Sequence, residues 1–150
     1  GSPEAHAYLR ALGADRIVPR SEFEDGPARP MDAGTWAGAI DAVGGDTLAT
    51  ILSQVQRHGS VAAFGNAGGH ALHTSVLPFI LRGVNLLGID SNTCPNARRR
   101  MAWERLADLL TDADYERIHA ETIALDAIPE AARRIVEGEV QGRILVDVAA

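Results

Sequence analysis

The fold is decided by residues 36–89, WAGAIDAVGGDTLATILSQVQRHGSVAAFGNAGGHALHTSVLPFILRGVNLLGI. Three continuously apolar runs, at 36–43, 60–64 and 84–89, are separated by segments whose apolar residues have helical spacing. Strands that alternate with helices at intervals of just over twenty residues indicate βαβ units and a parallel sheet. Continuous apolarity is expected when helices cover both faces of such a sheet. We therefore predict an α/β fold built on a doubly wound parallel sheet.

Further elements are predicted around these three strands. Ser2 is placed to cap a helix that begins at Pro3 and ends at Gly13, and Asp46 to cap the helix after the first strand. A polar segment rich in glycine and proline, at 21–35, is expected to be a surface loop. The remaining predictions are a short strand at 16–18, helices at 76–82, 97–110 and 126–137, and strands at 122–125 and 143–148.

Composition limits the class of protein. The 150 residues carry a formal charge of −6, which argues against nucleic acid or an anionic membrane as the main partner. No apolar stretch approaches the roughly 20 residues that a membrane span needs, and no secretory signal is recognisable. Cys94 is the single cysteine, so an internal disulfide is impossible, and we expect a cytoplasmic protein.

Polar or glycine-bearing turns follow all three central strands, at Gly44-Gly45, at Gly65–Gly69 and at Asp90-Ser91. Ligands of doubly wound sheets bind at the carboxyl ends of the strands, where such turns allow close approach to the backbone. Glycine also serves simply to turn the chain after a buried strand, so both interpretations stay open. The fingerprint G-x-G-x-x-G and the Walker sequence are absent, which predicts that the phosphate-cradling turn of a dinucleotide site is not in this chain.

Few side chains point to chemistry on their own. The five histidines lack any metal-ligand spacing, so we assign no metal, and Cys94 has no base beside it. Arg98–Arg100 are expected to form a solvated helix face or, alternatively, a patch for an anion or partner. Arg16 and Arg20 bracket the predicted strand at 16–18, where arginine can stack on adenine or bind a phosphate; an ordinary surface role is an equal alternative.

Taken together, five stretches resemble one family in order and spacing. They are YLRALGADRIVPRSEF (8–23), WAGAIDAVGG (36–45), SVAAFGNAGG (60–69), LPFILRGVNLLGIDS (77–91) and VQGRILV (140–146). The chain resembles the acrylyl-CoA reductase and YhdH-type quinone oxidoreductase family, the zinc-independent members of the medium-chain dehydrogenase/reductases. The likeness extends over essentially all 150 residues.

The resemblance implies an NADPH-dependent reductase with a Rossmann domain inserted in a GroES-like catalytic domain. It implies a partial Rossmann sheet that lacks its first two strands, with the diphosphate turn and most of the substrate domain upstream. Residues 1–120 would then be a partial NADP-binding domain, and residues 121–150 the C-terminal segment that returns to the catalytic domain. The reaction implied is hydride delivery from the nicotinamide to the C=C bond of an α,β-unsaturated acyl-CoA.

The resemblance also assigns the cofactor-binding residues. Arg20 corresponds to an arginine at the adenosine end of NADPH, and Asn66 to a position near the nicotinamide. Ile80 and Ser91 correspond to cofactor-lining positions, with Asp90 beside Ser91. Ser2 stands where relatives usually carry an arginine near the 2′-phosphate, and its hydroxyl can still bond a phosphate oxygen. Arg16, from its place at the end of the predicted strand, and Gly65, from the turn after the second strand, complete the predicted cofactor set, and no catalytic residue is expected within this chain.

Three alternatives stay open. The substrate could be a quinone or another enone, and the chain could be a non-catalytic fragment that associates with itself or a partner. It could also be an enoylreductase piece of a multidomain synthase. Without the first two Rossmann strands, residues 39–43 would form an apolar edge, so we expect a homodimer or an exchange of elements between copies.

Overall fold

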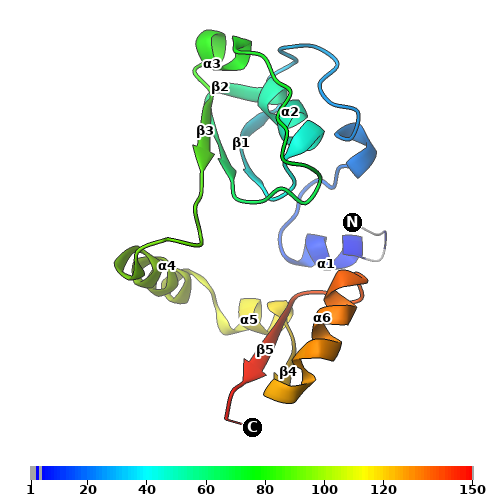
Figure 1. Cartoon of the computed structure of the whole chain (residues 1–150), viewed down its shortest axis with the longest axis vertical. Helices are drawn as coiled ribbons and strands as arrows, with labels where there is room; N and C mark the ends of the chain where they lie inside the picture. The colour runs from blue at the N-terminus through cyan, green and yellow to red at the C-terminus, as the bar shows by residue number, and fades with distance from the viewer. Residues whose placement is uncertain (1–2, 4, 150) are drawn as a thin grey trace. The chain divides into compact units, whose positions relative to one another are not determined.

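The computed structural model describes residue 3 and residues 5–149. The chain divides into two compact units (Figure 1). One unit spans Val18–Cys94, and the other joins the described residues up to Ile17 with those from Pro95 onward. The division expected near residue 120 concerns the longer relatives and stays a prediction.

The unit of residues 18–94 is built on a three-stranded parallel sheet in the order β1-β2-β3. The strands are β1 (Trp36–Asp41), β2 (Val55–Ala63) and β3 (Asn85–Gly88). Helix α2 (Gly45–Gln54) connects β1 to β2, and α3 (Leu77–Arg82) precedes β3. This arrangement confirms the predicted α/β fold with a parallel sheet. It also leaves β1 as an edge strand, with the Ile40 side chain 81% exposed.

The core of this unit lies between α2 and the sheet. Leu48 and Leu52 of α2 pack with Val55 and Val61 of β2 and with Val84, which precedes β3. Leu52, Val55 and Val61 are fully buried. Because burial of a side chain of this size contributes about 1.5–3 kcal/mol, this small cluster is the main source of stability in the unit.

Residues 31–36 lie along the C-terminal end of α2 and are hydrogen-bonded to it. The Asp32 amide donates to the Ser53 carbonyl at 2.9 Å, and the Thr35 amide to the Gln54 carbonyl at 2.7 Å. Arg82, at the end of α3, donates through Nη1 to the carbonyls of Ser53 and Val55, each at 3.0 Å, and through Nη2 to that of Asp32. A cation placed here satisfies carbonyls that the end of a helix leaves unpaired.

The second unit contains a βαβ motif. Strands β4 (His119–Ala124) and β5 (Arg143–Asp147) pair in parallel, and the crossover contains the 3-10 turn η2 (Leu125–Ala127) and helix α6 (Ile128–Val136). The other helices are α1 (Ala5–Ala11), α4 (Asn96–Leu109) and α5 (Asp112–Ile118). Helix α5 begins with a capping box. The Asp114 amide donates to the Thr111 hydroxyl, and the Thr111 amide donates to the Asp114 carboxylate. None of the described helices is long and apolar enough to cross a membrane.

Three local predictions were wrong. Residues 16–18 form no strand, and the chain continues into the 3-10 turn η1 (Arg20–Glu22), because a strand requires a hydrogen-bonded neighbour. The N-cap of α2 is Gly44, while Asp46 lies in the first turn. The strand predicted at 122–125 begins at His119 rather than at residue 122, after a helix that was not predicted.

Candidate functional site

The carboxyl ends of the three parallel strands meet at one edge of the sheet, as the arrowheads in Figure 1 show. The turn after β1 and the loop Gly65–Gly69 after β2 are joined by backbone hydrogen bonds. The Ala67 amide donates to the Ala42 carbonyl at 3.3 Å, and the Gly68 amide to the Val43 carbonyl at 2.7 Å. The two segments therefore form one continuous surface at this edge.

Close packing explains the glycines at this edge. Gly44 has φ 70° and ψ −157°, and a Cβ there would lie 2.5 Å from the Gly69 carbonyl oxygen. A Cβ on Gly65 would lie 2.5 Å from the Ala42 carbonyl oxygen. The tight-turn interpretation of these glycines is thus sufficient, although the Gly65 backbone is still exposed on its outer side.

Asp41, the last residue of β1, holds the first turn from within. Its carboxylate is only 2% exposed and accepts hydrogen bonds from the amides of Val43, at 3.2 Å, and Gly44, at 2.9 Å. Sequence reasoning missed this residue, although an aspartate before a glycine turn is a known signal for such a bond. Because the amides of Val43 and Gly44, which precede α2, are already bonded to Asp41, these two amides are not available to a phosphate.

The turn after β3 is ordered by a second carboxylate. Asp90 Oδ1 accepts from the amides of Asn92, at 3.0 Å, and Thr93, at 3.1 Å, and Oδ2 accepts from the Thr93 hydroxyl. The Thr93 hydroxyl and amide lower the pKa of Asp90 below its ordinary value, because they bond to its charged form. The Ser91 amide donates to the Ile89 carbonyl at 3.1 Å, which sets Ser91 in the same turn.

Four of the predicted cofactor residues come together at this edge: Gly65, Asn66, Asp90 and Ser91. All four are exposed. They lie on neighbouring strand ends, and the Ile89 amide bonds to the Ala63 carbonyl at 2.9 Å. The edge thus combines open backbone, one amide side chain, one hydroxyl and one carboxylate.

The other predicted residues lie elsewhere. Ile80 is 68% exposed on α3, which lies beyond the amino end of β3 in Figure 1. Arg20 is in η1 and forms an exposed ion pair with Glu24 at 4.0 Å. Arg16 is exposed and belongs to the other compact unit, and Ser2 is outside the described residues.

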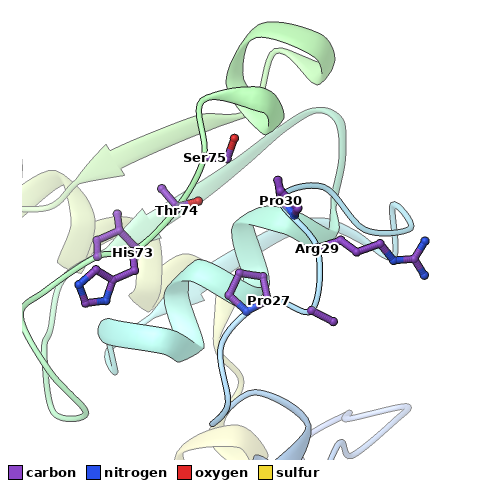
Figure 2. A pocket seen from close by; sticks show the side chains of 8 residues that line it. Pro27, Arg29, Pro30, His73, Thr74 and Ser75 are labelled. Atoms are coloured by element: carbon purple, nitrogen blue, oxygen red, sulfur yellow. The ribbon is translucent and has the colours of Figure 1, made fainter.

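An open depression of about 520 Å³ lies in the unit of residues 18–94, and none of the predicted cofactor residues lines it. It is lined by residues 27–30 and 72–75. Figure 2 shows the Arg29 side chain extending away from His73, so these two side chains of the depression do not converge on one ligand. Within the described part of the chain, no three His, Cys, Asp or Glu side chains are grouped so as to hold a metal ion.

Comparisons with known proteins agree with the resemblance seen in the sequence. Acrylyl-CoA reductase AcuI of Ruegeria pomeroyi is 49% identical over the whole chain, and the probable acrylyl-CoA reductase AcuI of Escherichia coli is 46% identical over 99% of it. A putative quinone oxidoreductase, YhfP of Bacillus subtilis, is 41% identical over 97% of it. The crystal structure of the YhdH oxidoreductase of Salmonella enterica in complex with NADP superposes with a TM-score of 0.90 at 47% identity, covering 99% of the chain.

The chain spans 45% of the length of the two acrylyl-CoA reductases and of the Salmonella enterica structure. Independently, the model of the zinc-binding dehydrogenase family matches residues 1–112, about three quarters of the chain. With the parallel sheet and the resemblance confirmed, the chain belongs to the zinc-binding dehydrogenase family, in which it is similar to the acrylyl-CoA reductases and their YhdH-type relatives.

Proposed function

We propose that the chain forms the cofactor-binding half of an NADPH-dependent reductase that reduces the C=C bond of an α,β-unsaturated acyl-CoA. The observation that carries this proposal is the 46–49% identity to two acrylyl-CoA reductases, which extends over 99–100% of the chain. Relatives have been solved with NADP or NADPH bound, among them the YhdH proteins of Salmonella enterica and Escherichia coli. Acrylyl-CoA itself is the expected substrate.

The carboxyl edge of the sheet fits the nicotinamide half of such a cofactor. Asn66 can both donate to and accept from a carboxamide, and Ser91 offers a hydroxyl. No side chain at Gly65 obstructs the loop. We propose that Gly65, Asn66, Asp90 and Ser91 line the nicotinamide half, where the bound cofactor would supply the hydride. The chain's own contribution is to position the cofactor and exclude water.

The adenosine half is assigned to other residues. We propose that Arg20, together with Arg16 and Ser2, binds toward the adenosine and its phosphate, and that Ile80 contributes apolar contact. The amides of Val43 and Gly44 are bonded to Asp41, and the sequence contains no G-x-G-x-x-G turn, so we propose that the diphosphate is bound by a turn that this chain does not supply. The described residues do not fit a zinc centre, and no step of the reaction is assigned to a metal.

We propose that residues 1–120 belong to the nucleotide-binding domain and residues 121–150 to the catalytic domain. We also propose that the protein is cytoplasmic. For the chain by itself, the open edge of β1, with Ile40 81% exposed, supports a homodimer. Sedimentation velocity tests this, since a compact monomer at micromolar concentration would contradict it.

A quinone or enone is the second candidate substrate, because the 41% identical relative from Bacillus subtilis is a putative quinone oxidoreductase. The two substrates are compared in a chimera in which this chain replaces the matching C-terminal segment of the Escherichia coli relative. We expect NADPH oxidation with acrylyl-CoA to exceed that with a quinone in kcat/KM. A preference for the quinone would favour the second candidate, and NADPH binding without turnover of either would favour a non-catalytic role.

Binding is tested first on the chain alone, by titration with NADPH and, for comparison, NADH. Low-micromolar binding with a preference for NADPH would support an adenosine site within these residues. Absence of binding up to about 1 mM, a free energy weaker than about −4 kcal/mol, would indicate an incomplete half-site and direct the test to the chimera.

A further inference from the structure

The Asp41 carboxylate is buried without a counter-ion. It is 2% exposed, and within the described part of the chain it forms no ion pair. Its partners are two backbone amides, those of Val43 at 3.2 Å and Gly44 at 2.9 Å. Burial of a carboxylate is costly unless such bonds compensate it, so both amides must be held toward it.

Those two bonds fix the direction of the carbonyl groups in the same turn. The Ala42 and Val43 carbonyls accept from the amides of Ala67 and Gly68, at 3.3 and 2.7 Å. The Asp41 carbonyl accepts from the Phe64 amide at 3.0 Å. The Asp41 side chain therefore orients the β1 turn, and the Asp41 carbonyl bonds directly to the start of the loop after β2.

The turn needs this support because its glycine backbone can adopt several conformations. Gly44 has φ 70° and ψ −157°, a region in which glycine is free but in which it loses more conformational entropy than other residues on ordering. Gly68 and Gly69 on the opposing loop are similarly permissive. The Asp41 side chain bonds directly to this backbone framework, at the amides of Val43 and Gly44.

We infer that Asp41 is a positioning residue for the nicotinamide half of the cofactor, which it acts on through the loop that carries Asn66. This inference rests on the proposed function, since it requires Asn66 to face the nicotinamide. Asp41 itself touches no ligand. Its carboxylate sets the β1 turn, the turn sets the Gly65–Gly69 loop, and the loop sets Asn66.

The test uses the chimera with the Escherichia coli relative and two ligands, NADPH and 2′,5′-ADP. The second ligand contains the adenosine and 2′-phosphate but no nicotinamide. We expect Asp41→Ala to weaken NADPH binding by about 10- to 100-fold, because small misplacements in a binding site carry penalties of this order. Binding of 2′,5′-ADP should change by less than about twofold, since it does not reach the loop.

Conservative and control variants separate positioning from lost stability. Asp41→Asn keeps one oxygen for the Gly44 amide and should recover part of the NADPH affinity. Asp46→Asn removes one negative charge from the first turn of α2, and Leu52→Val weakens the core; neither should separate the two ligands. The same split in the Leu52→Val chimera, a proportional loss of both ligands in Asp41→Ala, or unchanged NADPH binding would overturn the inference.

The failure of the proposed function gives a different result. If the unsubstituted chimera binds neither ligand, the proposed cofactor site is wrong, and the role of Asp41 is refuted with it. If the chimera binds NADPH but reduces no acyl-CoA, only the substrate assignment fails, and the ratio of the two affinities still decides the role of Asp41.

Discussion

Replacement of Arg82 with methionine should destabilise the unit of residues 18–94 by about 2–4 kcal/mol. The side chain is half-buried, and its guanidinium donates to the carbonyls of Ser53 and Val55, at 3.0 Å each, and of Asp32. A hydrogen bond from a charged donor contributes about 1.5–3 kcal/mol when protected from water. The total is set below the sum of three such bonds because the Ser53 carbonyl keeps the Asp32 amide and water can replace part of the rest.

The two tryptophans allow each unit to be followed separately. Trp36 begins β1 and donates through Nε1 to Gln54 at 2.9 Å, whereas Trp103 is 64% exposed on α4 in the other unit. With Trp103→Phe as background, Trp36 fluorescence during urea unfolding reports on residues 18–94, and Trp36→Phe gives the converse report. Arg82→Met should lower the midpoint only in the first background.

Arg57→Met is the matched control, because Arg57 donates one exposed hydrogen bond, to the Leu81 carbonyl at 3.0 Å. We expect it to change stability by no more than about 1 kcal/mol. Arg82→Lys should fall between the two, since a point-charge ammonium cannot present the guanidinium fork to several carbonyls. Equal losses for Arg82→Met and Arg57→Met would refute the reasoning, as would a loss reported equally by Trp103.

Three further changes have defined outcomes. The buried hydroxyl of Thr50 has no hydrogen-bond partner among the described residues, so Thr50→Val should stabilise the chain by up to about 1 kcal/mol in urea unfolding; a clear loss would mean that water satisfies the hydroxyl. Gly44→Ala should cost about 3 kcal/mol or more, because its φ is positive and a Cβ would meet the Gly69 carbonyl, and a thermal midpoint within a degree of the parent would contradict this. The hydrogen bonds from Arg133 lower the pKa of Glu130 below its ordinary value, so the contribution of this pair to stability is full above the ordinary pKa and is lost as the pH falls through the lowered pKa. Glu130→Gln should therefore flatten the acid side of the stability profile, and an unchanged profile would exclude this ion pair as a cause.

Most of the sheet could be predicted from the sequence because its signal is local. The runs at 36–43, 60–64 and 84–89 are mainly apolar, with Asp41, Ser60 and Asn85 as their polar members, and end in glycine or polar turns; the structure places a strand in each. The helix at 112–118 was missed because DADYERI has little apolar periodicity. Its one local signal is the Thr111-x-x-Asp114 spacing of a capping box.

The candidate site was predictable only in outline. Turn residues such as Gly65 and Ser91 follow from the rule that ligands bind at the carboxyl ends of parallel strands. The role of Asp41 did not follow, because burial of a carboxylate depends on amides that only the folded turn brings to it. Residues 16–18 show the opposite error, since the short run Arg16-Ile17-Val18 forms a strand only where a neighbouring strand exists to pair with it.

The open edge of β1 and the missing phosphate turn have one cause in this fold. In the doubly wound order, the strands that lie beside β1 belong to the first half of the sheet, and the glycine-rich phosphate turn follows the first of them. One added segment would therefore bury Ile40 and supply the diphosphate site together. Joining the N-terminal part of the Escherichia coli relative to this chain should thus raise the urea midpoint reported by Trp36 and the NADPH affinity in the same step. A chimera that gains NADPH affinity with no gain in the Trp36 midpoint would show that the added segment does not pair with β1.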